Sequence, residues 1–298
     1  MSTPTEAVLQ IEDLHVEIHQ AGHVTPILRG VDLRVTPGRI HALVGESGGG
    51  KSMVTKAATG LLPAAARISQ GRIVLDGQDV TRWTEPRWRT LRGRTVSMVL
   101  QDPLTALNPV RRIGAQMEDV LRLHQGLRGA EAAAECIRLL DHVQVREPER
   151  VLRLYPHQLS GGMRQRVVIA MAWACRPRLI ICDEPTTALD VTVQKQVLRL
   201  IKQLAGDGQG VLLVTHDLGV VAKLCDSLSV IHGGRILETG GVADVFAAPS
   251  HPYTRALLAA TPRFDRPGHT LVPVADELIA ELQAEGRAYD RQRQGARA

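Results

Sequence analysis

One eight-residue run has the composition of a phosphate-binding loop. It matches the pattern GxxxxGK[ST] and consists of Gly45, Glu46, Ser47, Gly48, Gly49, Gly50, Lys51 and Ser52. Glycines let backbone N–H groups wrap around phosphates, and the start of a helix adds partial positive charge. Lys51 would neutralise β- and γ-phosphate oxygens, and the Ser52 hydroxyl would bind Mg²⁺. A strand-like run at 40–44 and a helix-compatible run at 53–62 flank the loop, which argues against a glycine-rich turn without a ligand.

Polar residues also follow other apolar runs of the chain. Asp183 and Glu184 close one such run, Gln101 follows a second and His216 ends a third. Ligands of parallel α/β sheets bind at the carboxyl ends of strands, so we expect these side chains to gather there with Lys51. Two acids could hold a metal shell and polarise a water molecule. Taken singly, the acids could instead cap a helix, the glutamine could be a loop residue, and the histidine could be structural.

The spacing of apolar residues predicts the elements that position these groups. Between 178 and 216 a strand, a helix and a strand follow one another, which predicts a parallel sheet with right-handed crossovers. Alternating runs at 8–18 and 31–35 predict further strands. From about 102 to 168 the spacing turns helical. The pattern therefore predicts an α/β frame with an inserted all-α lobe.

Composition limits the class of protein. The 298 residues include 44% hydrophobic and 22% charged residues, ordinary values for a soluble globular protein. The formal net charge of +5 suits an anionic ligand, an anionic membrane surface or nucleic acid, and equally a solvated basic surface. Four scattered cysteines without a CxxC pair favour reduced thiols in a cytosolic compartment. We expect no signal peptide and no membrane span, because no run approaches roughly 18 apolar residues.

A second glycine-containing motif carries a resemblance to a known family. The run 159–166 reads LSGGMRQR and resembles the signature motif of ATP-binding-cassette (ABC) ATPases. Together with the phosphate loop, Gln101, Asp183–Glu184 and His216, it stands in the order and spacing of that family over about residues 8–262. The combination is very specific, because several separate motifs must all occur in one order.

The resemblance implies a fold and a domain organisation. The implied fold is α/β, a P-loop NTPase core with an antiparallel β-subdomain and an inserted α-helical signature subdomain at about 102–168. The nucleotide-binding domain is expected at 7–262. A C-terminal appendage is expected at 263–298, partly helical over 276–285 and frayed at its end, after Pro262, Pro267 and Gly268. Leu278, Ile279 and Leu282 could dock this helix onto a partner or onto the chain's own surface.

The resemblance also assigns roles around ATP and Mg²⁺. Glu184 is implied to be the base that polarises the attacking water. Asp183 is implied to hold Mg²⁺ together with Ser52 and Gln101. His216 is implied to hold the γ-phosphate and the water.

A further set of residues is implied to act between subunits. Ser160, Gly161 and Gly162 would donate hydrogen bonds to the γ-phosphate of ATP held by a second ABC ATPase subunit. Asp190, in the turn 188–190, would communicate between the two sites, and Gln101 would sense the transmembrane partner.

Finer likenesses point to a subfamily. The runs QDPLTALNP at 101–109, YPHQLS at 155–160 and HPYTRALL at 251–258 resemble the oligopeptide/dipeptide/nickel importers. The last run could instead be an amphipathic surface helix. The subfamily implies an ATP-hydrolysing subunit at the cytoplasmic face of the inner membrane, energising uptake of peptides or of nickel, metal-chelate or opine-like solutes. Its implied partners are a second ATPase subunit, two permeases and, indirectly, an external solute-binding protein.

The alternative function is that of a soluble ABC ATPase acting on nucleic acid or ribosomes. The usual marks of that class are two cassettes in one chain, a long coiled-coil insertion or zinc-binding cysteines, and the sequence has none of them. Its basic residues are also not interleaved with aromatic ones that could stack on bases. No nucleic-acid partner is therefore expected.

Two departures from the family pattern are visible. Many ABC ATPases stack adenine on an aromatic side chain before the phosphate loop, but here Ile18 aligns there and no Phe, Tyr or Trp precedes Trp83. Adenine contact is expected to be apolar or to use His19 or His23, with weak discrimination between bases. No cysteine follows Cys225, so an iron–sulfur cluster in the tail is not expected.

Overall fold

The computed structural model describes residues 6–187, 189–261 and 274–295. The chain divides into two compact units. Unit 1 contains Met1–Val8, Thr36–Arg39 and Trp83–Leu213, and unit 2 contains Leu9–Val35, Ile40–Arg82 and Val214–Ala298. Among the helices of the described ranges, none combines the length and the apolar character that crossing a membrane requires.

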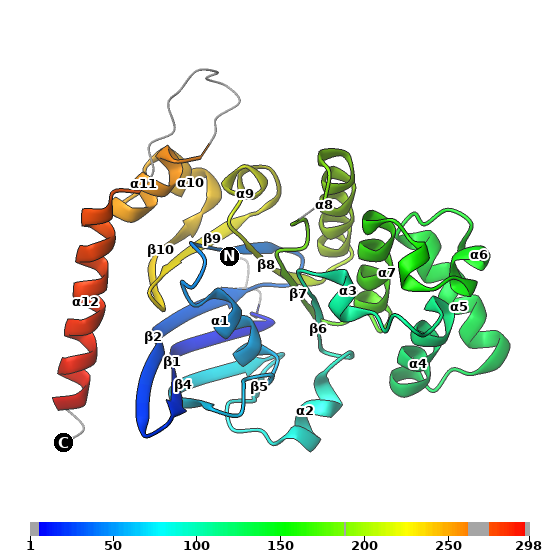
Figure 1. The fold of residues 1–298 in the computed structure, drawn as a ribbon, viewed down its shortest axis with the longest axis horizontal. Coiled ribbons are helices and arrows are strands. Elements are labelled where there is room, and N and C mark those ends of the chain that lie inside the picture. Colours follow the sequence, from blue (N-terminus) through cyan, green and yellow to red (C-terminus); the bar gives the residue numbers. More distant parts are fainter. Residues whose placement is uncertain (1–5, 188, 262–273, 296–298) are drawn as a thin grey trace. The chain divides into compact units, whose positions relative to one another are not determined.

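An antiparallel sheet in unit 2 confirms the expected β-subdomain (Figure 1). In the order β2-β1-β4-β5 its strands are β2 (His23–Val35), β1 (Leu9–Gln20), β4 (Ala66–Leu75) and β5 (Gln78–Asp79). A bulge at Asp13, where φ is 43°, shifts the register of β1 between Ile11 and Leu14. Ile11 and Leu14 are both buried although they are three positions apart, because the bulge inserts one extra residue between them.

A separate group of strands in unit 2 carries the phosphate loop. Strand β3 (Ile40–Val44) pairs in parallel with β9 (Ser227–His232), and β9 pairs antiparallel with β10 (Arg235–Gly241). Every residue of β3 is buried, as expected for a strand covered on both faces. Helix α1 (Lys51–Ala58) follows the loop, beginning and ending earlier than the predicted segment 53–62.

Helices from the C-terminal part of unit 2 pack on these strands. They are α9 (Leu218–Leu224), α10 (Val242–Ala247), α11 (Pro252–Ala259) and α12 (Asp276–Gly295). A single core cluster joins them to β3 and β9: Ala42, Val44, Leu218, Val221, Leu228, Val230, Val242, Val245, Tyr253 and Leu282. The strand that ends in the phosphate loop therefore shares its core with the C-terminal helices.

Helix α12 is longer than the helix predicted at 276–285. Leu282 is only 8% exposed and belongs to the core cluster, and Leu278 packs against it. The sequence left open whether this helix docks onto a partner or onto the chain itself. Leu278 and Leu282 pack onto the chain's own core in unit 2. Pro262, Pro267 and Gly268 lie outside the described residues.

The strands of unit 1 confirm the predicted alternation with helices. After α2 (Glu85–Leu91), strand β6 (Val96–Val99) pairs in parallel with β7 (Leu179–Asp183). Helix α8 (Val191–Gly206) then leads to β8 (Gly210–Thr215), which runs from unit 1 into unit 2.

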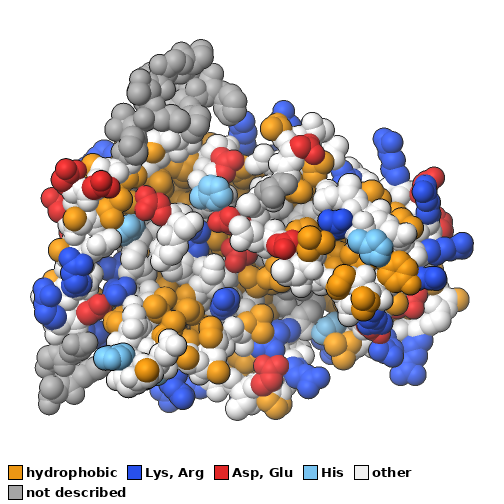
Figure 2. All heavy atoms as spheres, in the orientation of Figure 1, with side chains coloured by type: hydrophobic (Ala, Val, Ile, Leu, Met, Phe, Trp, Pro, Cys, Tyr) orange, Lys and Arg blue, Asp and Glu red, His pale blue; other side chains and the backbone are white. Residues whose placement is uncertain are grey.

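The helical lobe lies between β6 and β7 in the sequence and confirms the expected insertion (green in Figure 1). It comprises α3 (Pro103–Ala106), α4 (Ile113–Gln125), α5 (Gly129–His142), α6 (Pro148–Arg153), the 3₁₀ turn η1 (Pro156–Gln158) and α7 (Gly161–Trp173). The rings of His142 and Trp173 stack with centroids 3.8 Å apart, joining the ends of α5 and α7. On the face shown in Figure 2, several Lys and Arg side chains surround this lobe.

A buried histidine links β3 to β9. The Nδ1 atom of His41 lies 2.8 Å from Ser227 Oγ, and its Nε2 atom lies 2.9 Å from Ser229 Oγ. A neutral imidazole offers one donor and one acceptor, so both hydroxyls are satisfied without a charge. Burial lowers the pKa of His41 from 6.5 to about 4.

This histidine predicts a pH dependence of stability. As the pH falls from 6.5 towards about 4, the unfolded chain binds a proton at His41 that the folded chain excludes. The free energy of unfolding should therefore decrease, by about 1.4 kcal/mol per pH unit for one proton. Urea unfolding between about pH 7.5 and about pH 5 should show a shallower pH dependence for His41→Gln. His23 is exposed on β2, so His23→Gln is the matched control; equal slopes in all three proteins would contradict a neutral, buried His41.

Candidate nucleotide-binding and hydrolysis site

The phosphate loop is held by main-chain contacts with the end of β9. A Cβ atom on Gly45 would lie 2.1 Å from the carbonyl oxygen of Ile231, so only glycine fits there. The N–H of Gly234 donates to the Gly49 carbonyl oxygen at 2.9 Å. Gly50 has a φ of 108°, a conformation that L side chains rarely adopt. The glycines that the motif requires are therefore also required by the packing of the loop.

Lys51 lies inside the loop that precedes it. Its side chain is buried, and Nζ donates to the carbonyl oxygens of Gly45 at 2.7 Å and Glu46 at 2.8 Å. The ammonium group is thus placed at the start of α1, where no side chain caps the helix at Gly50. A helix N-terminus without a side-chain cap and an adjacent ammonium group together fit an anionic ligand such as a phosphate chain.

In unit 1 the structure brings Gln101 and Glu184 together. Gln101 Nε2 donates to Glu184 Oε2 at 3.0 Å, and Thr187 Oγ1 donates to the same oxygen at 3.0 Å. Glu184 has a φ of 46°, a left-handed conformation that costs of the order of 1 kcal/mol or more for a residue with a side chain. Strained backbone of this kind is common at functional sites. Thr187 was not predicted, because a threonine after an acid has no distinctive sequence signal.

Asp183 is the last residue of β7 and lies directly before Glu184, as the sequence predicted. It is half-buried. The two acids follow a strand in which Leu179–Cys182 are fully buried, so the backbone at the strand end is fixed by the core.

The signature motif forms the start of α7. Ser160 is the N-cap residue, and its Oγ accepts from the Met163 N–H at 3.3 Å. Asp190 caps α8 in the same way, accepting from the N–H groups of Thr192 and Val193. A Cβ atom on Gly162 would lie 2.5 Å from Val193 Cγ1, so the two helices meet at this glycine.

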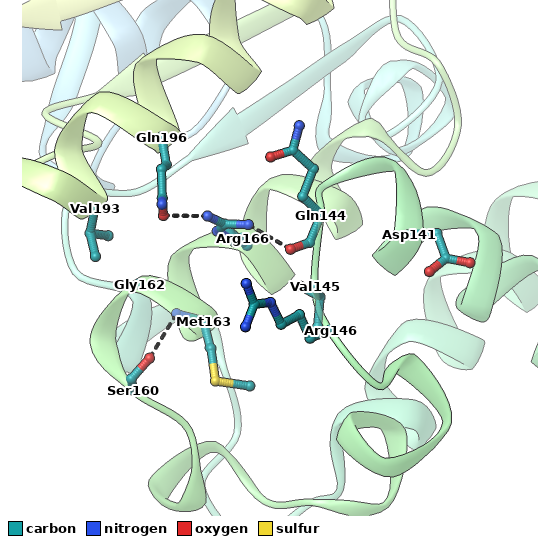
Figure 3. Close-up of a pocket in the computed structure, with 10 residues that line it drawn as sticks. All are labelled: Asp141, Gln144, Val145, Arg146, Ser160, Gly162, Met163, Arg166, Val193 and Gln196. Atoms are coloured by element: carbon teal, nitrogen blue, oxygen red, sulfur yellow. Dashed lines mark hydrogen bonds between the residues drawn. The ribbon is translucent and has the colours of Figure 1, made fainter.

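A pocket of about 650 Å³ opens beside the signature motif (Figure 3). Ser160 and Gly162 line it, together with Arg146 and Arg166. Arg166 donates to the Gln144 carbonyl oxygen at 2.6 Å and to the Gln196 side chain. Burial, and then the charge of Arg146, lower the pKa of Arg166. Two guanidinium groups next to a helix N-terminus make this pocket suited to an anion.

The predicted site residues are distributed over both units. The phosphate loop and His216 belong to unit 2, whereas Gln101, Asp183, Glu184 and the signature residues Ser160, Gly161 and Gly162 belong to unit 1. His216 follows β8 and precedes Asp217, the N-cap of α9. The expected gathering at strand ends is confirmed for Gln101 with Glu184 and stays a prediction for the other residues. Ala188 of the turn 188–190 lies outside the described residues.

Two family models match the chain. The model described as ABC transporter matches residues 28–187, more than half of the 298 residues. The chain therefore belongs to the ABC transporter family, and it is an ATPase. The model described as oligopeptide/dipeptide transporter, C-terminal region, matches residues 237–293. The resemblance of the 251–258 run to that subfamily is thereby confirmed.

Curated relatives agree with this assignment. The chain is 47% identical to the probable D,D-dipeptide transport ATP-binding protein DdpD of Escherichia coli K12, covering 93% of this chain and 85% of that protein. It is 43% identical to the dipeptide transport ATP-binding protein DppD of Bacillus subtilis, covering 90% and 81%. It is 48% identical to the peptidoglycan transport ATP-binding protein YejF of Agrobacterium fabrum over 89% of this chain, but it spans only 49% of that relative.

Solved structures confirm the fold. A dimeric structure of the ABC transporter cassette MJ0796 matches with a TM-score of 0.69 and 26% identity, covering 78% of this chain and 98% of that one. The same cassette in a post-hydrolysis state bound to ADP and Pi matches with a TM-score of 0.70 at 24% identity, which shows the fold alone.

The close approach of α7 and α8 can be tested with a matched pair of glycines. In Gly162→Ala the new methyl group would meet Val193 Cγ1 at 2.5 Å, whereas in Gly161→Ala it would lie 3.7 Å from Leu189 Cδ2. Overpacking should lower the melting temperature of Gly162→Ala by roughly 2–6 °C, while Gly161→Ala should keep or raise it. Adding Val193→Ala to Gly162→Ala should restore stability. A Gly162→Ala protein that melts like the wild type would show that α7 and α8 are not in close contact.

Proposed function

We propose that the chain is the ATP-hydrolysing subunit of an ABC importer that energises the uptake of peptides through partner permeases. The observation that carries this proposal is the match of residues 237–293 to the C-terminal region of oligopeptide/dipeptide transporters, in a chain that also has the ABC cassette. Relatives named for dipeptide and oligopeptide transport support peptides as the solute class. Nickel, metal-chelate and opine-like solutes have no comparable support.

The proposed nucleotide is ATP bound at Gly45–Ser52. Lys51 is already placed against the loop carbonyls and would move its ammonium group onto the β- and γ-phosphates. The donor set also fits Mg²⁺, because Ser52 offers a hydroxyl and Asp183 a carboxylate. The Nε2–H group of Gln101 donates to Glu184, so the amide oxygen of Gln101 is the atom that would bind the metal. When bound, the metal supplies charge neutralisation at the β- and γ-oxygens.

Glu184 is the proposed base. The hydrogen bonds from Gln101 and Thr187 converge on one carboxylate oxygen and fix its orientation. The carboxylate oriented in this way is proposed to accept a proton from an attacking water. His216 is proposed to hold the γ-phosphate and that water. Gln101 lies at the start of the helical lobe and donates to Glu184, the proposed base. A shift of the lobe would therefore reorient the Glu184 carboxylate.

The proposal includes partner subunits. Ser160, Gly161 and Gly162 would bind the γ-phosphate of ATP held by a second ATPase subunit, either a second copy or a sister chain, and Asp190 would link the two sites. The assembly would sit at the cytoplasmic face of the membrane on two permeases, with an external solute-binding protein acting indirectly. The dimeric structure of a cassette 26% identical to this chain supports two-subunit assembly.

A pull-down tests the assembly. The Glu184→Gln chain is tagged, expressed in its own cells and captured from solubilised membranes with ATP and Mg²⁺, and co-purifying proteins are identified by mass spectrometry. The proposal requires two multi-span permeases and an ATPase subunit. Recovery of nucleic acid or ribosomes without permeases would instead support the alternative of a soluble ABC ATPase.

Two substitutions separate binding from hydrolysis. Glu184→Gln should retain ATP binding and lose hydrolysis by about a hundredfold or more, because the base is removed while the shape is kept. It should also accumulate as an ATP-bound dimer, detectable by size-exclusion chromatography. Lys51→Ala should lose ATP binding, measured by calorimetric titration. Normal turnover by Glu184→Gln would exclude Glu184 as the base.

The lack of an aromatic residue before Trp83 predicts weak discrimination between bases. Without a stacking partner, affinity would come mainly from the phosphates, which ATP and GTP share. The KM values for ATP and GTP should therefore agree within about tenfold. Ile18→Tyr should increase the preference for ATP, with Val24→Tyr on the same sheet as the control. A wild-type preference for ATP far above tenfold would refute this prediction.

A further inference from the structure

The C-terminal region of the chain reaches the phosphate loop through the end of β9. Ile231 blocks any side chain at Gly45, and the Cα atom of His232 would lie 3.9 Å from a Cβ atom on Gly49. The turn that follows donates from Gly234 N–H to the Gly49 carbonyl oxygen at 2.9 Å. A displacement of His232 or of the turn would therefore displace the loop.

Tyr253 packs against His232. The two rings lie with centroids 4.7 Å apart at an interplanar angle of 53°, and Tyr253 is fully buried. Burial, and then the charge of Glu46 in the phosphate loop, raise the pKa of Tyr253. Burial also lowers the pKa of His232, so the ring is favoured in its neutral form against the opposing effect of Glu46. One tyrosine of α11 thus lies beside both the turn and the loop.

The start of α11 is fixed, which fixes Tyr253. His251 is the N-cap residue, and its Nδ1 accepts from the Tyr253 N–H at 3.1 Å. Glu238 of β10 accepts from the N–H groups of Ser250 at 2.7 Å and His251 at 3.0 Å. Burial alone would raise the pKa of Glu238, but the hydrogen bonds it receives outweigh burial and hold the pKa at about 2. The carboxylate therefore remains charged and retains these bonds.

Helix α12 is connected to the turn 232–234 through Arg29 of β2, which bonds to both. Arg29 of β2 donates from Nη1 to the Gly233 carbonyl oxygen at 2.7 Å. Its Nε and Nη2 atoms donate to the two carboxylate oxygens of Asp290 at 2.9 and 3.0 Å. The Arg29 N–H also donates to the Gly234 carbonyl oxygen at 2.8 Å. A planar, two-bond pair of this kind fixes direction as well as distance.

We propose that Tyr253 and His232 are positioning residues for the phosphate loop, through which the C-terminal region sets the affinity of the chain for ATP. This proposal rests on the proposed function of Gly45–Ser52 as the ATP site. Phosphate binding depends on several N–H groups that point at one place, so a small displacement of the loop weakens many hydrogen bonds at once. In this proposal both residues act through the turn 232–234 and through Gly45 and Gly49, and not by contact with the nucleotide.

A core position of the same cluster provides the matched control. Phe246 of α10 packs against the cluster that contains Tyr253. Tyr253→Leu removes an aromatic ring from this cluster and Phe246→Leu removes one packed against it, and of these two rings it is Tyr253 that is in ring contact with His232. The full-length variants are purified, their melting temperatures measured, and the Kd for ATP with Mg²⁺ determined by calorimetric titration at a temperature where each is folded.

We expect the two variants to lose stability alike but to differ in their affinity for ATP. Both variants should melt at a lower temperature, whereas the Kd for ATP should rise roughly tenfold only in Tyr253→Leu. In hydrolysis assays Tyr253→Leu should raise KM more than it lowers kcat, because the base is untouched. Tyr253→Phe keeps the ring and should restore most of the affinity. His232→Ala should raise the Kd in the same way, and combining it with Tyr253→Leu should add little.

Specific outcomes overturn the proposal. If Tyr253→Leu and Phe246→Leu change the Kd equally at equal loss of melting temperature, Tyr253 is only a core residue. If Tyr253→Leu does not fold, Tyr253→Phe and His232→Ala decide, and an unchanged Kd in His232→Ala refutes the role. The Lys51→Ala variant distinguishes a failure of this proposal from a failure of the proposed function. If Lys51→Ala binds ATP normally, the assignment of Gly45–Ser52 as the ATP site is wrong. If Lys51→Ala loses ATP binding, the measurements on Tyr253 and His232 test the positioning role alone.

Discussion

The phosphate loop depends on a main-chain contact that leaves no room for a side chain. The Ile231 carbonyl oxygen occupies the position of any Cβ atom at Gly45, and Gly234 bonds to Gly49 on the other side of the turn. Main-chain atoms cannot rotate away as side chains can, so the parallel pairing of β3 with β9 fixes the conformation of the loop. The glycines permit this arrangement, and the register of the two strands determines where the loop N–H groups point.

The carboxylate of Glu184 is held in a different way. Its backbone lies in the left-handed region, and its side chain is oriented by Gln101 and Thr187. Side-chain hydrogen bonds are weaker and more easily exchanged than a packed backbone. Gln101 directly precedes the helical lobe, which starts with the N-cap Asp102 of α3. The phosphate loop is therefore held by main-chain contacts, whereas the orientation of the Glu184 carboxylate depends on side-chain hydrogen bonds, one of them from a residue at the start of the lobe.

Local patterns in the sequence indicated much of the fold, and a family resemblance supplied most of the candidate site. The phosphate loop and the strands before Gln101 and Glu184 consist of neighbouring residues, so their spacing indicated them, whereas the signature motif was identified by its resemblance to ABC ATPases. Contacts between distant segments were not predicted, because no local pattern encodes them. The pairing of Gln101 with Glu184, 83 residues apart, was expected only as a general gathering of side chains, and the role of Thr187 was missed. The bulge at Asp13 and the full length of α12 also depend on tertiary packing.

The run 251–258 shows how packing gives a motif its place in the fold. Helix α11 is amphipathic: Tyr253 and Thr254 are buried, Arg255 on the other face is exposed, and the start of the helix is held by Glu238. Its buried side lies on the same core as Ala42 and Val44 of β3. Tyr253 and Thr254 are buried within unit 2 and are therefore closed to a solute. The buried side of the motif thus packs on the strand that ends in the phosphate loop, which is the arrangement that the proposed positioning role of Tyr253 requires.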